Sequence, residues 1–378
     1  MRGGIESVAN TAEVQAMLRA VELAALGLGA TSPNPVVGAV VLDSVGAIAG
    51  YGFHRRAGDP HAEMVALEVA GIRARGGTCV VTLEPCNHTG RTGPCVAALR
   101  EAGVARVVYA VDDPTPAAGG GAAALRAAGV AVEGGVLKHE AELVNEVWLT
   151  SVRFGRPFVT WKYAASLDGR TAAVDGSSRW ITSEAARADA HRLRAEADAV
   201  LVGSGTVLAD NPQLAVRKAG LPSRQPLRVV LDARVRVQPT ARVLDAAAPT
   251  LLLVAADQSD GPAAERLRSA GAEVVGVPTA VGGGLDVAAV LAELHRRQIL
   301  SLLVEGGAQV AGSFLAAGLI DRVVGYLAPM LIGGDGVATL AGPGASSIDS
   351  ALRLRLDHTV LLGGDVRLTA RPIRAGTE

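Results

Sequence analysis

The feature that most constrains the fold of this 378-residue chain is an alternation of helical and β-strand patterns, which runs through it twice. In the first part, helical patterns mark the segments 11–26, 61–72, 95–101 and 122–128. Short apolar runs, mostly β-branched, lie between them at 36–42, 78–83 and 104–111. Such alternation predicts an α/β domain in which a mainly parallel sheet is flanked by helices.

The pattern restarts after residues 153–157, whose sequence Arg-Phe-Gly-Arg-Pro leads into a new strand. Beyond this point we expect strands at 158–162, 199–202, 227–231, 250–254, 300–304 and 322–327. We expect helices at 183–197, with Ser183 as the N-cap, at 263–269 and at 308–317. Because ordinary domains have about 100–200 residues, we predict two α/β domains, residues 1–149 and 150–378.

Composition narrows the classes of partner. Lys and Arg number 36 and Asp and Glu 37, which gives a net charge of −1. Proteins that bind polynucleotides or anionic membranes usually carry a basic excess, so we expect no nucleic-acid or membrane partner. The 49% hydrophobic and 19% charged residues argue against a disordered chain. No run of 18 apolar residues occurs, and the N-terminus lacks the apolar region of a signal peptide, so we expect a cytoplasmic protein.

One imidazole and two thiols in the first part have the spacing of a metal site. His61 and Glu63 open a helical segment, Cys86 follows the strand 78–83, and Cys95 opens the next helix. Three protein ligands leave zinc a fourth position for water, which is the catalytic arrangement. Two thiolates balance the charge of Zn²⁺, and a helix N-terminus favours a thiolate. We therefore predict zinc bound by His61, Cys86 and Cys95.

Glu63 lies two residues after the predicted histidine ligand, where it reaches the activated water without binding the metal and moves its proton. The pattern is that of zinc nucleobase deaminases, except that eight residues, 87–94, separate the cysteines instead of two. Alternatively, Cys86 and Cys95 form a disulfide or are core thiols, but neither explains the histidine and the glutamate. Cys79 is expected to be a packed core thiol. For the loop residues His54 and His88 we expect solvated positions, with a substrate contact as the alternative.

Two segments then identify a family. The loop from Cys86 to Cys95 and the segment from Ser32 to Gly38 closely resemble those of the bifunctional riboflavin-biosynthesis deaminase/reductase family. The resemblance implies a cytidine-deaminase-like α/β/α domain in which Asn34 holds the pyrimidine ring. At Gly93 the family often has a second proline, a change that loosens the loop. Shorter cytidine, guanine and tRNA-adenosine deaminases usually lack the long loop.

In the second part, four segments each give a weak signal. They are Lys162–Thr171, with a tight Asp-Gly turn; Ser178–Thr182, before a helix with Arg187 and Arg194 on one side; Gly203–Pro212, expected as a Gly-rich strand-to-loop segment; and Val304–Ala308, which joins a strand to a helix. In the last segment two glycines let backbone N–H groups face a phosphate. Turn chemistry and solvated arginines would explain each one alone.

Taken together, in this order, the four segments resemble the reductase half of the same family, whose fold is like that of dihydrofolate reductase and whose cofactor is NADPH. The resemblance implies cofactor contacts at Ala164, Trp180, Thr206, Asp210, Gly306, Gly307, Ala308, Gln309, Val310, Ala311 and Gly312. It implies substrate contacts at Ser178, Arg194, Leu214, Arg217 and Glu305. Arg194 and Arg217 are suited to clamp a ribose phosphate, since guanidinium binds phosphate bidentately. Lys162, Asp168 and Asp210 are expected near the site, and Met330 stands where we expect a basic residue.

The resemblance implies two successive steps of riboflavin biosynthesis. Zinc-dependent deamination of 2,5-diamino-6-ribosylamino-4(3H)-pyrimidinone 5′-phosphate comes first, and NADPH then reduces the ribosyl group to ribityl. A homo-oligomer with one zinc per deaminase domain is expected. Two rival hypotheses remain. One is a zinc deaminase of another nucleobase with an inactive or different second domain, and the other is a structural zinc module beside an active reductase. The long loop argues against the first, and the three-ligand set with Glu63 against the second.

Overall fold

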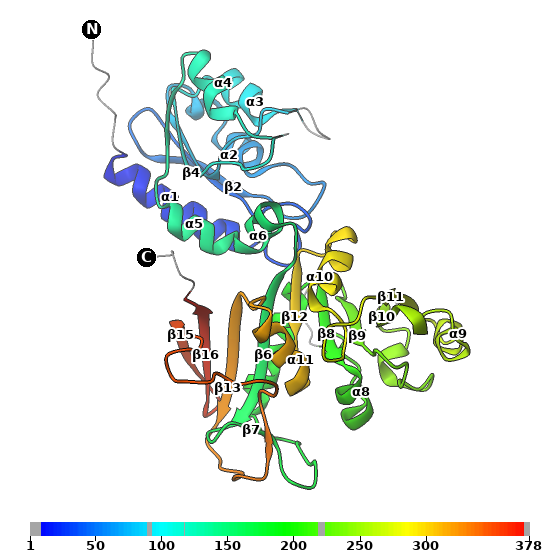
Figure 1. Ribbon diagram of the computed structural model, residues 1–378. Coiled ribbons are helices and arrows are strands. Elements are labelled where there is room, and N and C mark those ends of the chain that lie inside the picture. The colour runs from blue at the N-terminus through cyan, green and yellow to red at the C-terminus, as the bar shows by residue number, and fades with distance from the viewer. Residues whose placement is uncertain (1–8, 89–92, 117, 218–223, 374–378) are drawn as a thin grey trace. The chain divides into compact units, whose positions relative to one another are not determined.

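The computed structural model describes residues 9–88, 93–116, 118–217 and 224–373, and the chain divides into two compact units between Gly155 and Arg156 (Figure 1). In the first unit, five strands form one sheet in the order β2-β1-β3-β4-β5. These strands are β1 Gly38–Leu42, β2 Ile48–Phe53, β3 Thr78–Leu83, β4 Arg106–Val111 and β5 Ala131–Gly134. The helices are α1 Thr11–Ala25, α2 Ala62–Ala70, α3 Cys95–Glu101, α4 Gly121–Ala127, α5 Lys138–Val144 and α6 Glu146–Phe154.

Helices cover both faces of this sheet, with α1 and α5 on one side and α2, α3 and α4 on the other (Figure 1). The expected mainly parallel sheet is wrong for one half. The β3-β4-β5 part is parallel, but β1 pairs antiparallel with both β2 and β3. β1 and β2 are antiparallel because they form a hairpin, whose turn is closed by the Asp43 carboxylate through hydrogen bonds from Val45 N and Ala47 N. β2 was not predicted, because its glycines break the apolar pattern. One of them, Gly52, lets α2 pack closely, because a Cβ atom there would lie 2.6 Å from Val65.

The second unit is built on a nine-stranded sheet in the order β11-β10-β9-β8-β12-β6-β13-β16-β15. The first seven strands in this order are parallel, and the last two are antiparallel. The strands are β6 Phe158–Ser166, β8 Ala199–Gly203, β9 Leu227–Leu231, β10 Thr250–Ala255, β11 Glu273–Val277, β12 Ser301–Val304, β13 Arg322–Ala328, β15 Leu354–Leu362 and β16 Asp365–Pro372. A small separate sheet pairs β7 Arg170–Ala172 with β14 Val337–Ala338.

The parallel strands are buried on both faces. The helices of this unit are α7 Glu184–Glu196, α8 Ser204–Asp210, α9 Pro262–Ser269, α10 Val287–Arg296 and α11 Ala308–Ala316. Alternate residues of each strand point to opposite faces, so Leu201 lies in a cluster with residues of α10 and α11, and Val200 in one with residues of α7, α8 and α9. The expected N-cap is confirmed, since the Ser183 side chain accepts a hydrogen bond from Ala186 N. In the described part of the chain, no helix is long and apolar enough to cross a membrane.

The segment Gly203–Pro212 corrects one expectation. We expected a strand followed by a loop, but β8 runs directly into helix α8. Gly203 is extended and caps the helix, Val207 is buried in the core, and Asn211 ends the helix with a left-handed φ of 41°. Glycine lowers helix propensity by only about 1 kcal/mol, so one buried apolar contact can outweigh Gly205.

Candidate functional site

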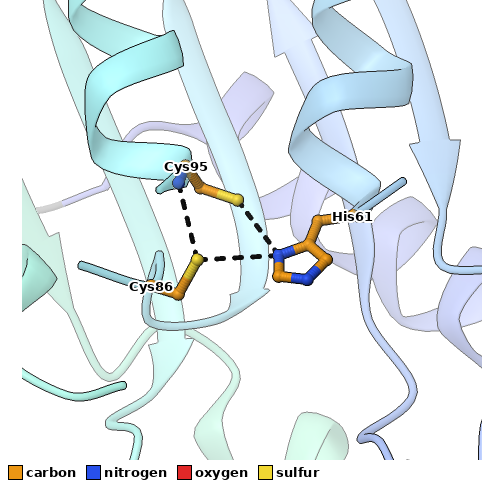
Figure 2. A group of neighbouring side chains, drawn as sticks. All are labelled: His61, Cys86 and Cys95. Carbon is orange, nitrogen blue, oxygen red and sulfur yellow. Dashed lines mark hydrogen bonds between the residues drawn. The ribbon is translucent and has the colours of Figure 1, made fainter. Parts of the chain in front are cut away.

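The predicted metal ligands come together at the ends of three elements of the first unit (Figure 2). His61 precedes α2, Cys95 is the first residue of α3, and Cys86 lies in the loop after β3. The Nδ1 atom of His61 is 3.3 Å from Cys95 Sγ and 3.6 Å from Cys86 Sγ. Ligands of one tetrahedral zinc lie about 3.5 Å apart, so the three donor atoms fit that ion.

Hydrogen bonding prepares this set for a cation. Cys95 N donates to Cys86 Sγ over 3.4 Å, so the N-terminus of α3 faces the sulfur of Cys86. A hydrogen bond from the Cys95 thiol, assisted by His61, lowers the pKa of Cys86 to about 4. The same contact raises the pKa of Cys95, and the hydrogen bond to Cys86 raises that of His61. The surroundings of Cys86 therefore favour its thiolate, which is the form that binds zinc.

Glu63 lies beside these ligands and outside the group that they form. It is the second residue of α2, its exposure is 4%, and the three ligand atoms lie within 4.8 Å of one another without it. Burial raises the pKa of Glu63, and a hydrogen bond to its own backbone N–H and the charge of His61 oppose the rise. A buried carboxyl next to the metal ligands is suited to take up and release a proton.

A buried histidine, His54, lies against the predicted ring-binding residue. His54 is only 3% exposed, so the expected solvated position is wrong, whereas His88 is exposed as expected. With its proton on Nδ1, His54 donates to the Pro60 carbonyl over 3.1 Å and accepts from the Asn34 amide over 3.2 Å. The side chain of Asn34 is thereby held, half-buried, near His61, whose ring is 5.7 Å from that of His54. No local pattern around residue 54 signals this burial.

The loop after β3 is fixed by a carboxylate that we did not predict as functional. Glu84 is buried, and its side chain accepts hydrogen bonds from Ala122 N at 2.8 Å and Asp113 N at 3.2 Å. These bonds hold the chain two residues before Cys86.

The three cysteines, all in the described part of the chain, are free thiols, so Cys86 and Cys95 do not form the alternative disulfide. Cys79 is fully buried in β3, which confirms the prediction of a core thiol. The ligand-loop residues 89–92 lie outside the described part of the chain.

The second constellation gathers where parallel strands end in the other unit. Gly306 and Gly307 connect β12 to α11, and Gly307 has a left-handed φ of 79°. A Cβ atom at Gly306 would lie 3.0 Å from Thr206 Oγ1 of α8. The structure thus brings Thr206 and the glycine turn together at the carboxyl edge of the sheet, where α/β proteins bind nucleotides.

Glu305, just before those glycines, forms a two-pronged ion pair with Arg194 of α7. Arg194 Nε donates to Oε1 at 2.5 Å and Nη2 to Oε2 at 2.7 Å. Burial would raise the pKa of Glu305, but the charge of Arg194 outweighs it, so that pKa lies below its usual value. Lys162 is half-buried nearby, and desolvation lowers its pKa against the opposing effect of Glu305. Two of the three guanidinium nitrogens of Arg194 are therefore already engaged.

Comparison with known proteins decides the family. A profile of the RibD C-terminal domain matches residues 157–368, and one of the cytidine and deoxycytidylate deaminase zinc-binding region matches residues 11–111. Riboflavin biosynthesis protein RibD of Bacillus amyloliquefaciens is 45% identical over 361 residues, which cover 94% of this chain and 95% of that protein. RibD of Mycobacterium tuberculosis is 46% identical over 359 residues, covering 94% and 96%. This chain belongs to the RibD family.

Solved structures agree over nearly the whole length. The structure of Acinetobacter baumannii RibD, form 1, has a TM-score of 0.85 at 38% identity and covers 96% of this chain and 99% of its own. The structure of the Thermotoga maritima diaminohydroxyphosphoribosylaminopyrimidine deaminase/5-amino-6-(5-phosphoribosylamino)uracil reductase also has a TM-score of 0.85, at 36% identity, and covers 96% of this chain and 99% of its own. The expected cytidine-deaminase-like and reductase folds are confirmed.

The other predicted residues of this RibD-family chain are spread around the second constellation. Trp180 is 66% exposed and lies under the guanidinium of Arg187, 4.2 Å from the ring centre. Ser178 is half-buried, and Arg217 is exposed. Leu214 is buried in the cluster that contains residues of α7. These positions leave Trp180 and Arg217 open to a ligand.

Two further predicted residues take part in hydrogen bonds, Asp168 through its carboxylate and Asp210 through its backbone carbonyl. The Asp168 carboxylate accepts hydrogen bonds from Ser166 Oγ and from Ile332 N and Gly333 N, and these bonds lower its pKa to about 2. The Asp210 carbonyl accepts from Arg179 Nη2 over 2.9 Å. Asp168 therefore holds the turn of the RibD reductase unit together, as the turn reading of its sequence allows.

His191 is a residue near this site that we did not predict. It lies three residues before Arg194 on α7, and its Nδ1 is buried without a hydrogen-bond partner. Burial lowers the pKa of His191, and the charges of Arg194 and Arg217 lower it further. Its spacing from Arg194 on one helical face was the only available signal.

Proposed function

We propose that this chain is a bifunctional enzyme of riboflavin biosynthesis, a zinc-dependent deaminase in residues 1–149 and an NADPH-dependent reductase in residues 150–378. The observation that carries the proposal is the cluster of His61, Cys86 and Cys95 beside Glu63, within a chain that matches RibD proteins over 94% of its length. A structural zinc module would need a fourth protein ligand and no buried glutamate.

The first site would act on 2,5-diamino-6-ribosylamino-4(3H)-pyrimidinone 5′-phosphate. A zinc ion held by the three ligands, one per domain, would supply an acidified water as the nucleophile. Glu63 would take a proton from that water and pass it to the ring nitrogen. It would then carry the proton of the newly attached hydroxyl to the amino group, which leaves as ammonia. Asn34, held by His54, orients the pyrimidine ring, because an amide can both donate to and accept from the edge of a base.

The second site would reduce the ribosyl group of the product to ribityl. NADPH supplies the hydride, and the protein positions it. We assign cofactor contacts to Ala164, Trp180, Thr206, Asp210 and residues 306–312. The close approach of Thr206 to Gly306 supports this assignment, because it brings two of the assigned contacts together at the glycine turn.

Substrate contacts in the second site are assigned to Ser178, Arg194, Leu214, Arg217 and Glu305. Arg217 is exposed and is suited to bind the phosphate with its whole guanidinium. Arg194 would contribute through Nη1, since Glu305 accepts from its Nε and Nη2. The ion pair then sets the direction of the free nitrogen.

We further propose that the enzyme works in the cytoplasm as a homo-oligomer on this small substrate. The net charge of −1 supports a small-molecule partner. Apolar side chains exposed on β15 support self-association, among them Leu356 at 58% and Leu361 at 75% exposure.

The test is a two-stage assay of the purified, zinc-loaded chain with the diaminopyrimidinone ribosyl phosphate. Ammonia is measured first without nicotinamide, and oxidation of NADPH and of NADH is then followed separately. The proposal predicts ammonia release followed by NADPH oxidation. Absence of ammonia from a zinc-containing protein would contradict the deaminase assignment, and ammonia without nucleotide oxidation would contradict the reductase assignment.

A further inference from the structure

The segment 211–217 follows α8 without forming a helix or strand, and it carries two of the proposed substrate contacts. Leu214 and Ala215 are 3% and 2% exposed, and Arg217 follows them on the surface. Leu214 has a φ of 58°, a left-handed conformation that a branched residue adopts only when its surroundings impose it. Something must therefore hold this segment from both sides.

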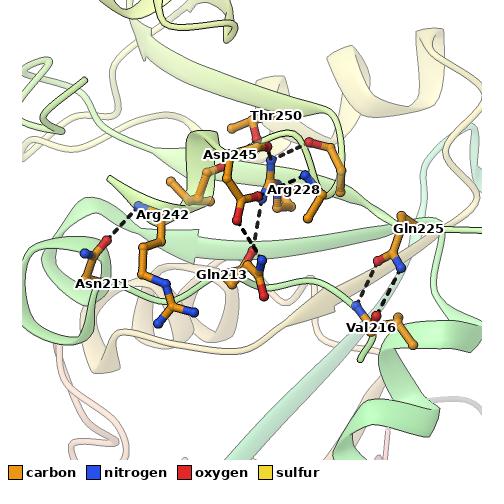
Figure 3. A network of polar contacts seen from close by, with 11 residues as sticks. Asn211, Gln213, Val216, Gln225, Arg228, Arg242, Asp245 and Thr250 are labelled. Carbon is orange, nitrogen blue, oxygen red and sulfur yellow. Dashed lines mark hydrogen bonds and ion pairs between the residues drawn. The ribbon is translucent and has the colours of Figure 1, made fainter. Parts of the chain in front are cut away.

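A fully buried arginine holds the first side (Figure 3). Arg228 of β9 donates from Nη1 to the Gln213 carbonyl at 3.2 Å and to Asp245 Oδ1 at 2.7 Å. Its Nη2 donates to the Asp245 carbonyl at 2.5 Å and to that of Ala248. The Gln213 side chain donates in turn to Asp245 Oδ2 at 2.6 Å. Both the backbone and the side chain of Gln213, which precedes Leu214, are thereby fixed.

A glutamine holds the second side, also visible in Figure 3. Val216 N donates to Gln225 Oε1 at 2.8 Å, and Gln225 Nε2 donates back to the Val216 carbonyl at 3.0 Å. This pair copies the exchange of two bonds between paired strands and leaves Val216 little freedom. The next residue is Arg217, so its Cα position is set by the Gln225 amide.

Packing alone does not explain Arg228. Its side chain is 1% exposed and its Nε has no hydrogen-bond partner, so its burial carries a desolvation cost. Well-packed apolar residues often replace such buried ion pairs without loss of stability. What an apolar residue could not do is donate to the Gln213 carbonyl and to Asp245 at once. The arginine is therefore suited to hold the Gln213 carbonyl and the Asp245 carboxylate in fixed positions.

We propose that Arg228, Asp245 and Gln225 are positioning residues for the reductase reaction, which fix the segment 211–217 so that Arg217 meets the phosphate of the substrate. The proposal rests on the assigned phosphate contact of Arg217. None of the three residues touches the substrate. Their effect acts through Arg217 and is confined to recognition of the phosphorylated substrate, while NADPH binding is unaffected.

The test uses Gln225→Met in the full-length chain. This substitution removes both hydrogen bonds between the Gln225 side chain and the Val216 backbone without adding charge beside Arg217. The matched control is Gln298→Met, at an exposed glutamine. With 5-amino-6-(5-phosphoribosylamino)uracil as substrate, loss of the two bonds should raise KM about 10-fold. The kcat and the Kd for NADPH, measured by nicotinamide fluorescence, should stay within about twofold of the wild-type values, as should all three constants of the control.

A double-mutant cycle separates this proposal from a general structural effect. In an Arg217→Ala background, Gln225→Met should raise KM no further, because the residue through which it acts is gone. Equal effects in both backgrounds, or an unchanged KM for Gln225→Met when Arg217→Ala raises it, would overturn the positioning role. An unchanged KM for Arg217→Ala itself would overturn the phosphate contact instead. Arg228→Met serves as a second variant. Its thermal unfolding shows whether it is folded at the assay temperature, and its KM is measured there.

Discussion

Replacing Glu305 by glutamine should destabilise the C-terminal unit, because it removes the counter-charge of Arg194 and of the neighbouring Lys162. The side chains of Arg194 and Glu305 are only 15% and 4% exposed, and Lys162 is half-buried near them. Removing one partner of a buried ion pair costs about 3–5 kcal/mol. Glutamine keeps one acceptor for Arg194, so we expect the lower end, about 3 kcal/mol.

In a unit of this size, each kcal/mol lowers Tm by about 2–4 °C, so Glu305→Gln should lower it by about 6–12 °C. Differential scanning calorimetry at pH 7 measures the shift. Glu273→Gln is the matched control, because Glu273 also binds an arginine, Arg297, through two bonds of 2.6 and 2.7 Å but is 56% exposed. Such a surface pair contributes about 0–1 kcal/mol. If Glu305→Gln melts within about 2 °C of the control, the buried-pair reasoning is wrong.

The pH dependence gives an independent check. Because Arg194 holds the pKa of folded Glu305 below its usual value of 4.5, the pair stabilises the protein above that value. The contribution is lost as pH falls through the lower, folded pKa. The difference in Tm between wild type and Glu305→Gln should therefore shrink below pH 4.5. If the difference in Tm stays constant down to the pH at which the protein unfolds in acid, Glu305 does not stabilise the protein through its charge.

Three predictions concern the two sites. Glu63→Gln should lower ammonia release by about 10²–10⁴-fold with near-normal zinc content, because it removes only the proton carrier; wild-type turnover would exclude Glu63 from that role. Zinc removal by a chelator should abolish ammonia release yet leave reduction of the deaminated substrate intact, as separate ammonia and NADPH assays would show; a parallel loss of reduction would contradict independent sites. Arg217→Ala should raise the reductase KM for the phosphorylated substrate by about 10-fold, because a charge-assisted bond contributes about 1.5–3 kcal/mol; unchanged KM and kcat would remove Arg217 from the phosphate site.

Local patterns predicted much of the fold because local physics determines it. The expected strands at 78–83 and 227–231 and the helix at 95–101 match the observed elements residue for residue. The metal ligands were also readable, since donor type and spacing constrain a zinc site strongly. Their meeting within 4.8 Å required only that strand and helix ends lie at one edge of the sheet.

What sequence could not supply were contacts between distant segments. Arg194 and Glu305 are 111 residues apart, and nothing near either one indicates the partner that occupies it. Arg228 looked like one residue of an apolar strand, and its polar partners become visible only in the folded chain. His54 was misjudged because loop histidines are usually solvated, whereas here Asn34 and Pro60 satisfy its ring nitrogens.

The most direct test of the two-site account is NADPH oxidation by the Glu63→Gln chain with each of the two substrates. The account predicts that oxidation with the diaminopyrimidinone ribosyl phosphate falls by about 10²–10⁴-fold, because the impaired deamination then limits it. It predicts oxidation at the wild-type rate with 5-amino-6-(5-phosphoribosylamino)uracil, because the reductase site is untouched. Rapid oxidation with the undeaminated substrate, or none with the deaminated one, would contradict the order of the two reactions and the independence of their sites.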